Sequence, residues 1–123
     1  MLAAHIGAVL AVTGVITALP IILFVAPASG LRLLFKLELA DQAGSFMARH
    51  WGLLAFTIGA LLVYAAGHPA VRVPAVLAAL VEKTGLVALI LWQWNEPHTR
   101  GMRLTALFDG ACSAVYAAWL IGA

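Results

Sequence analysis

The stretch that decides the fold is residues 74–94, PAVLAALVEKTGLVALILWQW, and a second apolar stretch lies at residues 50–66, HWGLLAFTIGALLVYAA. A membrane-spanning helix needs about 20 mostly apolar residues, and both stretches come close to that length. Near the centre of the first stretch, Glu82 and Lys83 stand side by side. Charged side chains are rare and costly at that depth of a bilayer, so these two indicate where to look for a functional site.

The composition is that of a membrane protein. Hydrophobic residues make up 64% of the chain and charged residues 10%, with a mean hydropathy of +1.04. Soluble domains have about 45–50% apolar and about 25% charged residues. A chain of 123 residues has room for one domain, residues 1–123, and four spans use nearly all of it. The net charge of +2 is too small to indicate a nucleic-acid partner.

The predicted fold class is all-α: an integral membrane bundle of four transmembrane helices with a short interfacial helix after the first. The expected spans are roughly residues 2–25, 41–66, 74–94 and 102–122. Pro20 is expected to kink the first span near Ile16, and Asp41 or Ser45 is expected to cap the second. Residues 31–41, LRLLFKLELAD, predict the interfacial helix, with apolar side chains facing lipid and charged ones facing headgroups.

Basic residues are unevenly divided among the connections. Only Arg72 lies in the second connection, whereas the first and third connections contain Arg32, Lys36, Arg49, Arg100 and Arg103. The positive-inside rule therefore predicts a multi-pass protein of the cell membrane, with the first and third loops cytoplasmic and both termini outside.

Small residues recur along three of the predicted helices and predict close helix packing. On the fourth helix they recur every four residues, at Gly110, Ala114, Ala118 and Gly122. Gly7, Ala11 and Gly14 on the first helix, and Gly52, Ala55 and Gly59 on the second, form similar sets. Alanine is abundant in this chain, so some of these matches also arise by chance.

Ionisable side chains within spans face the bundle interior or a water-filled cavity, usually with a partner. Counting antiparallel helices from their turns places Asp109 beside Arg49 or His50 on the cytoplasmic side. Glu82 lies deeper, by roughly 9 Å at 1.5 Å per residue. Its layer is expected to contain Thr13, Thr57, Ser113 and Tyr116, so the helices would enclose a polar channel or pocket.

The candidate site residues follow from this arrangement. The candidate acid–base residues are Glu82, Asp109 and His50. The candidate ligand-binding residues are Arg49, Trp51, Thr57, Lys83, Ser113, Tyr116 and Trp92. Structural roles compete with each assignment: Arg49 and Asp109 as an ion pair that fixes helix register, Glu82 as a hydrogen-bonded acid, and His50 as an anchor at the membrane edge.

Motifs for several kinds of chemistry are absent from the sequence: GxSxG, HExxH, a phosphate loop and paired cysteines,. His5, His68 and His98 are too far apart to predict a metal site, and no two histidines fall on facing helices at one depth, as haem would require. No metal or cofactor is therefore predicted.

The RHWG stretch at residues 49–52, the Pro-led third helix with Glu82 and Lys83, and Asp109 early in the fourth helix resemble small bacterial four-helix membrane proteins of the DoxX-like kind. That resemblance covers most of the chain and implies a bundle in a bacterial inner membrane, sometimes an accessory to redox enzymes. It supplies no catalytic residues. A looser similarity, to sterol isomerases of the emopamil-binding type, is one of architecture alone, because the local motifs differ.

Three functions are compatible with the sequence. The favoured one is a non-catalytic membrane protein that binds a lipophilic small molecule, such as a quinone, an isoprenoid or a sterol-like compound, or that serves as an accessory subunit. The alternative is an enzyme on such a molecule, with Glu82 as proton donor or acceptor in an isomerisation, cyclisation or epoxide opening. A subunit of a transporter or channel is the third. Expected partners are the lipid bilayer, the lipophilic molecule, and a second copy of the chain or another membrane protein.

Overall fold

The computed structural model describes residues 2–122, and over that range the chain is helical, without strands. The long helices are α1 (Leu2–Ala18), α4 (Gln42–Ala66), α5 (Arg72–Trp92) and α6 (Arg103–Leu120), and the shorter ones are η1 (Leu19–Ile21), α2 (Ile22–Val25), α3 (Pro27–Phe35), η2 (Pro69–Val71) and η3 (Pro97–Met102). The all-α prediction is confirmed, and the predicted bounds agree with the observed ones to within a few residues.

Three helical segments of the described chain are long and apolar enough to cross a membrane: Leu2–Val25, Gln42–Ala66 and Pro69–Trp92. The segment α6, expected as a fourth span, is not among them. It has 18 residues, or about 27 Å at 1.5 Å per residue, and it carries Arg103 at its start and Asp109 near its middle. Those charges lower its hydropathy below that of the other three.

The two expected helix signals have the predicted effect. Pro20 lies in the 3₁₀ turn η1, which separates α1 from α2, so the first span changes direction just beyond the expected kink. Asp41 caps α4, where its Oδ1 accepts a hydrogen bond of 2.7 Å from the Gly44 backbone N–H. This bond satisfies one of the free N–H groups at the start of the longest helix.

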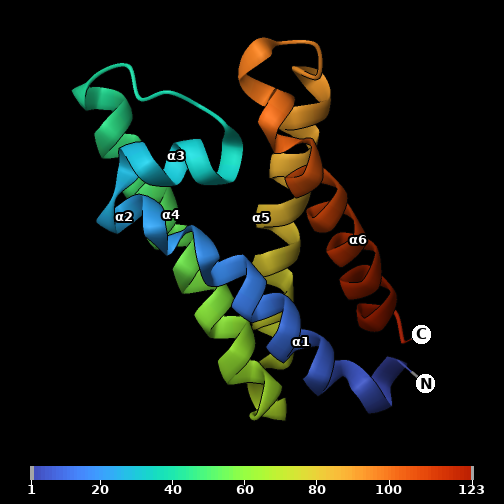
Figure 1. Ribbon diagram of the computed structural model, residues 1–123. Helices are drawn as coiled ribbons and strands as arrows, with labels where there is room; N and C mark the ends of the chain where they lie inside the picture. Colours follow the sequence, from blue (N-terminus) through green and yellow to red (C-terminus); the bar gives the residue numbers. More distant parts are fainter. Residues whose placement is uncertain (1, 123) are drawn as a thin grey trace.

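The bundle consists of two helix pairs. Figure 1 shows α1 crossing α4 and α6 running beside α5, with the two pairs converging near the termini and diverging at the opposite end. The first and third connections lie together at the diverging end, and both termini lie at the other. The helix α3 spans the diverging end and contacts η3. The bundle is therefore closed at one end and open between its pairs at the other.

The closed end contains the main core cluster, in which side chains from all four long helices meet. Its largest fully buried members include Leu10 of α1, Leu62 of α4, Val76 of α5 and Tyr116 of α6, all at 0% exposure. The Tyr116 hydroxyl and the Thr13 Oγ1 lie 2.6 Å apart and form a hydrogen bond between α6 and α1. The expectation that Thr13 and Tyr116 share a layer is confirmed.

The interfacial helix differs from its prediction. Helix α3 begins at Pro27 and ends at Phe35, where Lys36 takes a left-handed conformation with φ 55°. The Phe35 side chain is 3% exposed and stacks on Trp51, with ring centroids 4.9 Å apart. Phe35 was expected to face lipid, and that prediction is wrong, because α3 turns this ring inward to fill space between the diverging pairs.

The small-residue sets on α1 and α4 face each other. A Cβ atom on Gly59 would lie 2.5 Å from the backbone oxygen of Gly14 and 2.5 Å from the backbone nitrogen of Ala18. Only glycine permits that approach of two backbones. The set on α6 behaves differently: a Cβ on Gly110 would meet nothing within 4 Å, and Ala114 is exposed. Within residues 2–122, the α6 set is thus not a packing face toward another helix.

Candidate functional site

A buried ion pair joins α5 to α6. The Lys83 Nζ lies 2.9 Å from the Asp109 Oδ1, and the two residues are 1% and 4% exposed. The Lys83 ammonium also lies 4.9 Å from the centroid of the Phe108 ring, a cation–π contact,. The partner of Asp109 is therefore Lys83, and the prediction that Asp109 pairs with Arg49 or His50 is wrong.

The error came from the assumed register of the third connection. Counting from a tight turn between Trp94 and Arg103 had placed Asp109 level with Ala88. Helix α5 ends at Trp92 and the separate 3₁₀ helix η3 precedes α6, so the turn is not tight. The long Lys83 side chain covers the remaining distance. Arg49 is exposed and donates instead to the backbone oxygen of Phe24.

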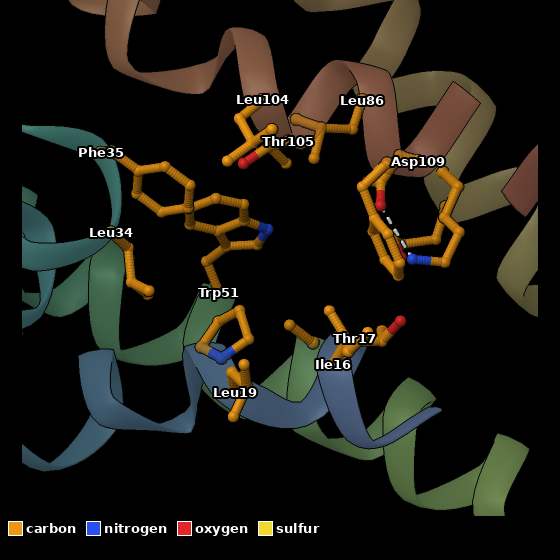
Figure 2. Close-up of a pocket in the computed structure, with 15 residues that line it drawn as sticks. Ile16, Thr17, Leu19, Leu34, Phe35, Trp51, Leu86, Leu104, Thr105 and Asp109 are labelled. Atoms are coloured by element: carbon orange, nitrogen blue, oxygen red, sulfur yellow. Dashed lines mark hydrogen bonds and ion pairs between the residues drawn. The ribbon is translucent and has the colours of Figure 1, made fainter. Parts of the chain in front are cut away.

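A cavity of about 420 Å³ lies between the two helix pairs, beside this ion pair (Figure 2). We refer to it as the central cavity. Its walls come from α1 and η1 on one side, α3 and α4 on a second, and α5 and α6 on a third. The lining residues are Ile16, Thr17, Leu19, Pro20, Leu34, Phe35, Trp51, Ala55, Glu82, Lys83, Leu86, Leu104, Thr105, Phe108 and Asp109. Four of the predicted site residues are thus together: Glu82, Lys83, Asp109 and Trp51.

The cavity is open to the molecular surface. Three of its lining side chains, Ile16, Leu19 and Leu104, are 41%, 56% and 76% exposed. They come from α1, η1 and the start of α6, between which the pairs diverge. The cavity therefore reaches an apolar outer surface of the bundle without any movement of the helices.

Three groups that can form hydrogen bonds line the cavity without a hydrogen-bond partner among residues 2–122: the Glu82 carboxyl, the Thr105 hydroxyl and the Trp51 indole N–H. Successive residues on a helix point about 100° apart, so Lys83 reaches α6 while Glu82 lies on the cavity wall. Figure 2 shows the Trp51 ring nitrogen pointing into the cavity. Within residues 2–122 no fully buried side-chain N or O atom lacks a hydrogen-bond partner, so the polar atoms of these three groups are accessible and available to a bound molecule.

Several predicted site residues lie elsewhere. His50 and Thr57 are exposed, and the Thr57 hydroxyl donates to the Leu53 carbonyl of its own helix. Trp92 is 81% exposed. These three residues and Arg49 therefore do not line the cavity. The direction of a side chain depends on its position around the helix, and not on its depth along the helix.

Ser113 and Tyr116 lie on α6 beyond Asp109, toward the closed end. The Ser113 Oγ donates to the Asp109 carbonyl at 2.7 Å, and Tyr116 is fully buried against Thr13. Neither lines the central cavity. Tyr116 belongs to the core cluster of the closed end, where it is packed among apolar side chains.

Sequence reasoning missed most of the apolar wall. Thr105 and Phe108 precede Asp109 by four and one residues, and Thr105 therefore shares a face of α6 with it. That spacing was a usable signal. Phe35 and Leu34 had no such signal, because their inward position depends on how α3 folds back between the pairs. Within the described chain, no three His, Cys, Asp or Glu side chains are grouped to hold a metal ion.

Comparisons with known protein families, characterised proteins and solved structures find no match to this chain. The resemblances to DoxX-like proteins and to sterol isomerases therefore stay predictions. The described chain is a helical bundle with a cavity between two helix pairs and with three segments long and apolar enough to cross a membrane, and the function must be argued from that cavity.

Proposed function

We propose that the protein binds a lipophilic small molecule, of the quinone, isoprenoid or sterol-like kind, in the central cavity. The observation that carries the proposal is an apolar, aromatic-walled space of about 420 Å³ with three hydrogen-bonding groups that have no hydrogen-bond partner among the described residues. Small-molecule sites commonly have about 300–1,000 Å³, mostly apolar walls and a few convergent polar groups. The exposed side chains at its mouth would admit such a molecule directly from the acyl-chain region of a bilayer.

The polar groups of the cavity determine which hydrogen-bonding groups a ligand would need. Trp51 N–H donates only, so a ligand carbonyl or hydroxyl oxygen is its natural partner. The Thr105 hydroxyl donates or accepts, and the Glu82 carboxyl accepts a hydrogen bond when ionised and donates one when protonated. Stacked Trp51 and Phe35 would form a flat wall for a ring or an isoprenoid chain.

Substitution of Leu86 by Trp tests this proposal. Leu86 lines the cavity on α5, so the larger side chain would occupy ligand space. The matched control is Leu89→Trp, at a position on the same helix that is 55% exposed and does not line the cavity. Mass spectrometry of organic extracts should detect a lipophilic molecule with the wild type and Leu89→Trp, and should not detect it with Leu86→Trp. Equal retention by all three proteins would contradict the proposal.

An acid–base enzyme is the second candidate, favoured by the unpartnered carboxyl of Glu82 at the cavity wall. Once the ligand is known, Glu82→Gln should preserve binding but remove proton transfer, with a loss of about 10²–10⁴-fold in turnover. Glu96→Gln, in the exposed connection before η3, is the control. A Glu82→Gln protein with full turnover would exclude the catalytic role and leave the binding role.

We propose α6 as a fourth membrane-crossing helix in the same bundle. Asp109, the charge near its centre, is buried and paired with Lys83. Arg103, at its start, donates to the Trp94 carbonyl at 3.1 Å and lies over the Trp94 ring, an arrangement suited to a membrane interface. The charges that lower its hydropathy are therefore either neutralised or placed at the edge of the span.

The proposed orientation places the diverging end in the cytoplasm, because five basic residues lie there and only Arg72 lies near the other end. In a background in which Cys112, the only cysteine, is replaced by Ala, single cysteines at His68 and Arg100 test it. A membrane-impermeant maleimide added to intact cells should label position 68, and should label position 100 only after the cells are opened. The reverse pattern would invert the topology.

A further inference from the structure

A second cavity, of about 540 Å³, lies between α3 and η3 at the diverging end. We refer to it as the basic cavity. It is lined by Leu33, Leu34, Lys36, Pro97, Arg100, Gly101, Leu104 and Thr105. Leu34, Leu104 and Thr105 also line the central cavity. The two cavities therefore adjoin, and these three residues form the wall between them.

The two basic residues of the basic cavity, Lys36 and Arg100, differ from the other five Lys and Arg residues. Of the seven Lys and Arg residues, five have a partner: Arg32 has Glu38, Lys83 has Asp109, and Arg49, Arg72 and Arg103 donate to backbone carbonyls. Lys36 and Arg100 have no hydrogen bond or ion pair among residues 2–122. They line the same cavity, and no carboxylate lines it with them.

The backbone holds these two cations at one place. A Cβ on Gly101 would overlap the Phe35 carbonyl, so η3 contacts the end of α3 at a glycine. Lys36 and Arg100 are the chain neighbours of these two contacting residues. The left-handed conformation of Lys36, which ends α3, is unusual for a lysine. The contact thus fixes both charged residues beside the cavity, although their side chains remain exposed.

We propose that the two cavities form one site for an anionic amphiphile, with a phosphate head between Lys36 and Arg100 and an aliphatic chain in the central cavity. A phosphate monoester carries about −1.5 to −2 charges at neutral pH, which matches two cations, and arginine is well suited to phosphate oxygens. Basic pockets at the cytoplasmic side of membrane helices bind lipid head groups in this way. The position of the ligand's aliphatic chain rests on the proposed function, whereas the position of its phosphate head does not.

Binding of three probes to the purified protein in a non-ionic detergent, measured by native mass spectrometry, tests the proposal. The probes are dodecyl phosphate, 1-dodecanol and inorganic phosphate. The wild type should bind dodecyl phosphate more tightly than dodecanol, and should bind inorganic phosphate much more weakly than either. If inorganic phosphate bound as tightly as dodecyl phosphate, the dodecyl chain would contribute nothing to the affinity. A site for an amphiphile would then be excluded.

Charge removal tests the head position. Lys36→Asn and Arg100→Gln should each weaken dodecyl phosphate binding about fivefold, and together roughly 30-fold, with dodecanol binding unchanged. Asparagine is chosen at position 36 because it tolerates the left-handed conformation. The control is Arg32→Gln, which removes a charge on α3 that is paired with Glu38 outside both cavities. An equal loss with the control, or no loss with the two variants, would overturn the head position.

Leu86→Trp separates this proposal from the proposed function. It should weaken binding of both alkyl probes, because both chains would occupy the central cavity, while Leu89→Trp should not. If Leu86→Trp weakened dodecanol binding alone, the phosphate compound would bind with its chain elsewhere, and the single-site proposal would fail while the proposed function stood. If Leu86→Trp left both unchanged, the single-site proposal and the proposed function would fail together.

Discussion

Where α1 crosses α4, two glycines bring the helix backbones together, whereas α5 and α6 are joined by a buried lysine and aspartate. The first contact has no room for a side chain, since a Cβ on Gly59 would overlap backbone atoms of Gly14 and Ala18. The second has side chains between the helices, and one side of it faces the central cavity. Both kinds of contact occur between helices in membranes, where lipid competes with apolar side chains for helix surfaces.

The difference shows what each pair contributes. Close backbone packing joins α1 to α4 without an ion pair between them, since glycines leave no room for side chains at the crossing. An ion pair is a costly way to join helices, because both charges must be taken out of water. Its presence on α5 and α6 places charge beside the cavity, which backbone packing cannot do. In the proposed function, the charged groups of the central cavity therefore come from the second pair, and the first pair adds the Trp51 N–H.

The largest effect is expected at the ion pair. Lys83→Met or Asp109→Leu alone leaves one buried charge without its partner, and should lower the free energy of unfolding by about 3–5 kcal/mol. The double variant, which leaves no charge, should be much less destabilised than the sum of the two. Unfolding in mixed micelles measures all four proteins.

Arg49→Gln provides the control for that cycle. Because Arg49 bonds to the Phe24 carbonyl and not to Asp109, its effect should add to that of Asp109→Leu. Strong coupling between Arg49 and Asp109, with none between Lys83 and Asp109, would show that the charges are paired differently from the geometry described above.

The glycine crossing should give the next largest effect. Gly59→Ala places a methyl group against backbone atoms that have no freedom to move, and should cost about 3 kcal/mol, at the upper end for overpacking. Gly110→Ala is the matched substitution on α6, where nothing lies within 4 Å, and it should change stability by at most about 1 kcal/mol, in the favourable direction. Similar losses at both positions would remove the contrast between the two pairs.

The smallest effect concerns the hydrogen bond that joins the pairs at the closed end. Thr13→Val removes the partner of the Tyr116 hydroxyl and should cost about 0.6 kcal/mol, the average for hydrogen bonds between membrane helices, and at most about 1.7 kcal/mol. Thr84→Val is the control, because the exposed Thr84 hydroxyl donates only to carbonyls of its own helix. If both substitutions had the same effect, the Thr13–Tyr116 bond would contribute nothing to joining the two halves.

The positions of the helices were predictable because they depend on local properties. Pro20, Asp41 and the apolar stretches act over a few residues, and the observed η1 turn, the α4 cap and the spans lie where those signals are. Trp51, Glu82, Lys83 and Asp109, four of the predicted site residues, line the central cavity. Thr57, Trp92 and His50 do not line it, since residues at one depth need not share a face.

The sequence by itself determined that the chain is helical, that it contains long apolar segments suited to a membrane, and that Glu82 and Lys83 lie within one of them. Only the tertiary structure decided the contacts: Lys83 pairs with Asp109, Phe35 stacks on Trp51, and the Glu82 carboxyl has no hydrogen bond among residues 2–122. The physical reason is that a partner depends on the crossing and register of two helices, which long-range contacts such as Gly14 with Gly59 and Phe35 with Gly101 fix. Those contacts join residues far apart in the chain, so no local pattern specifies them.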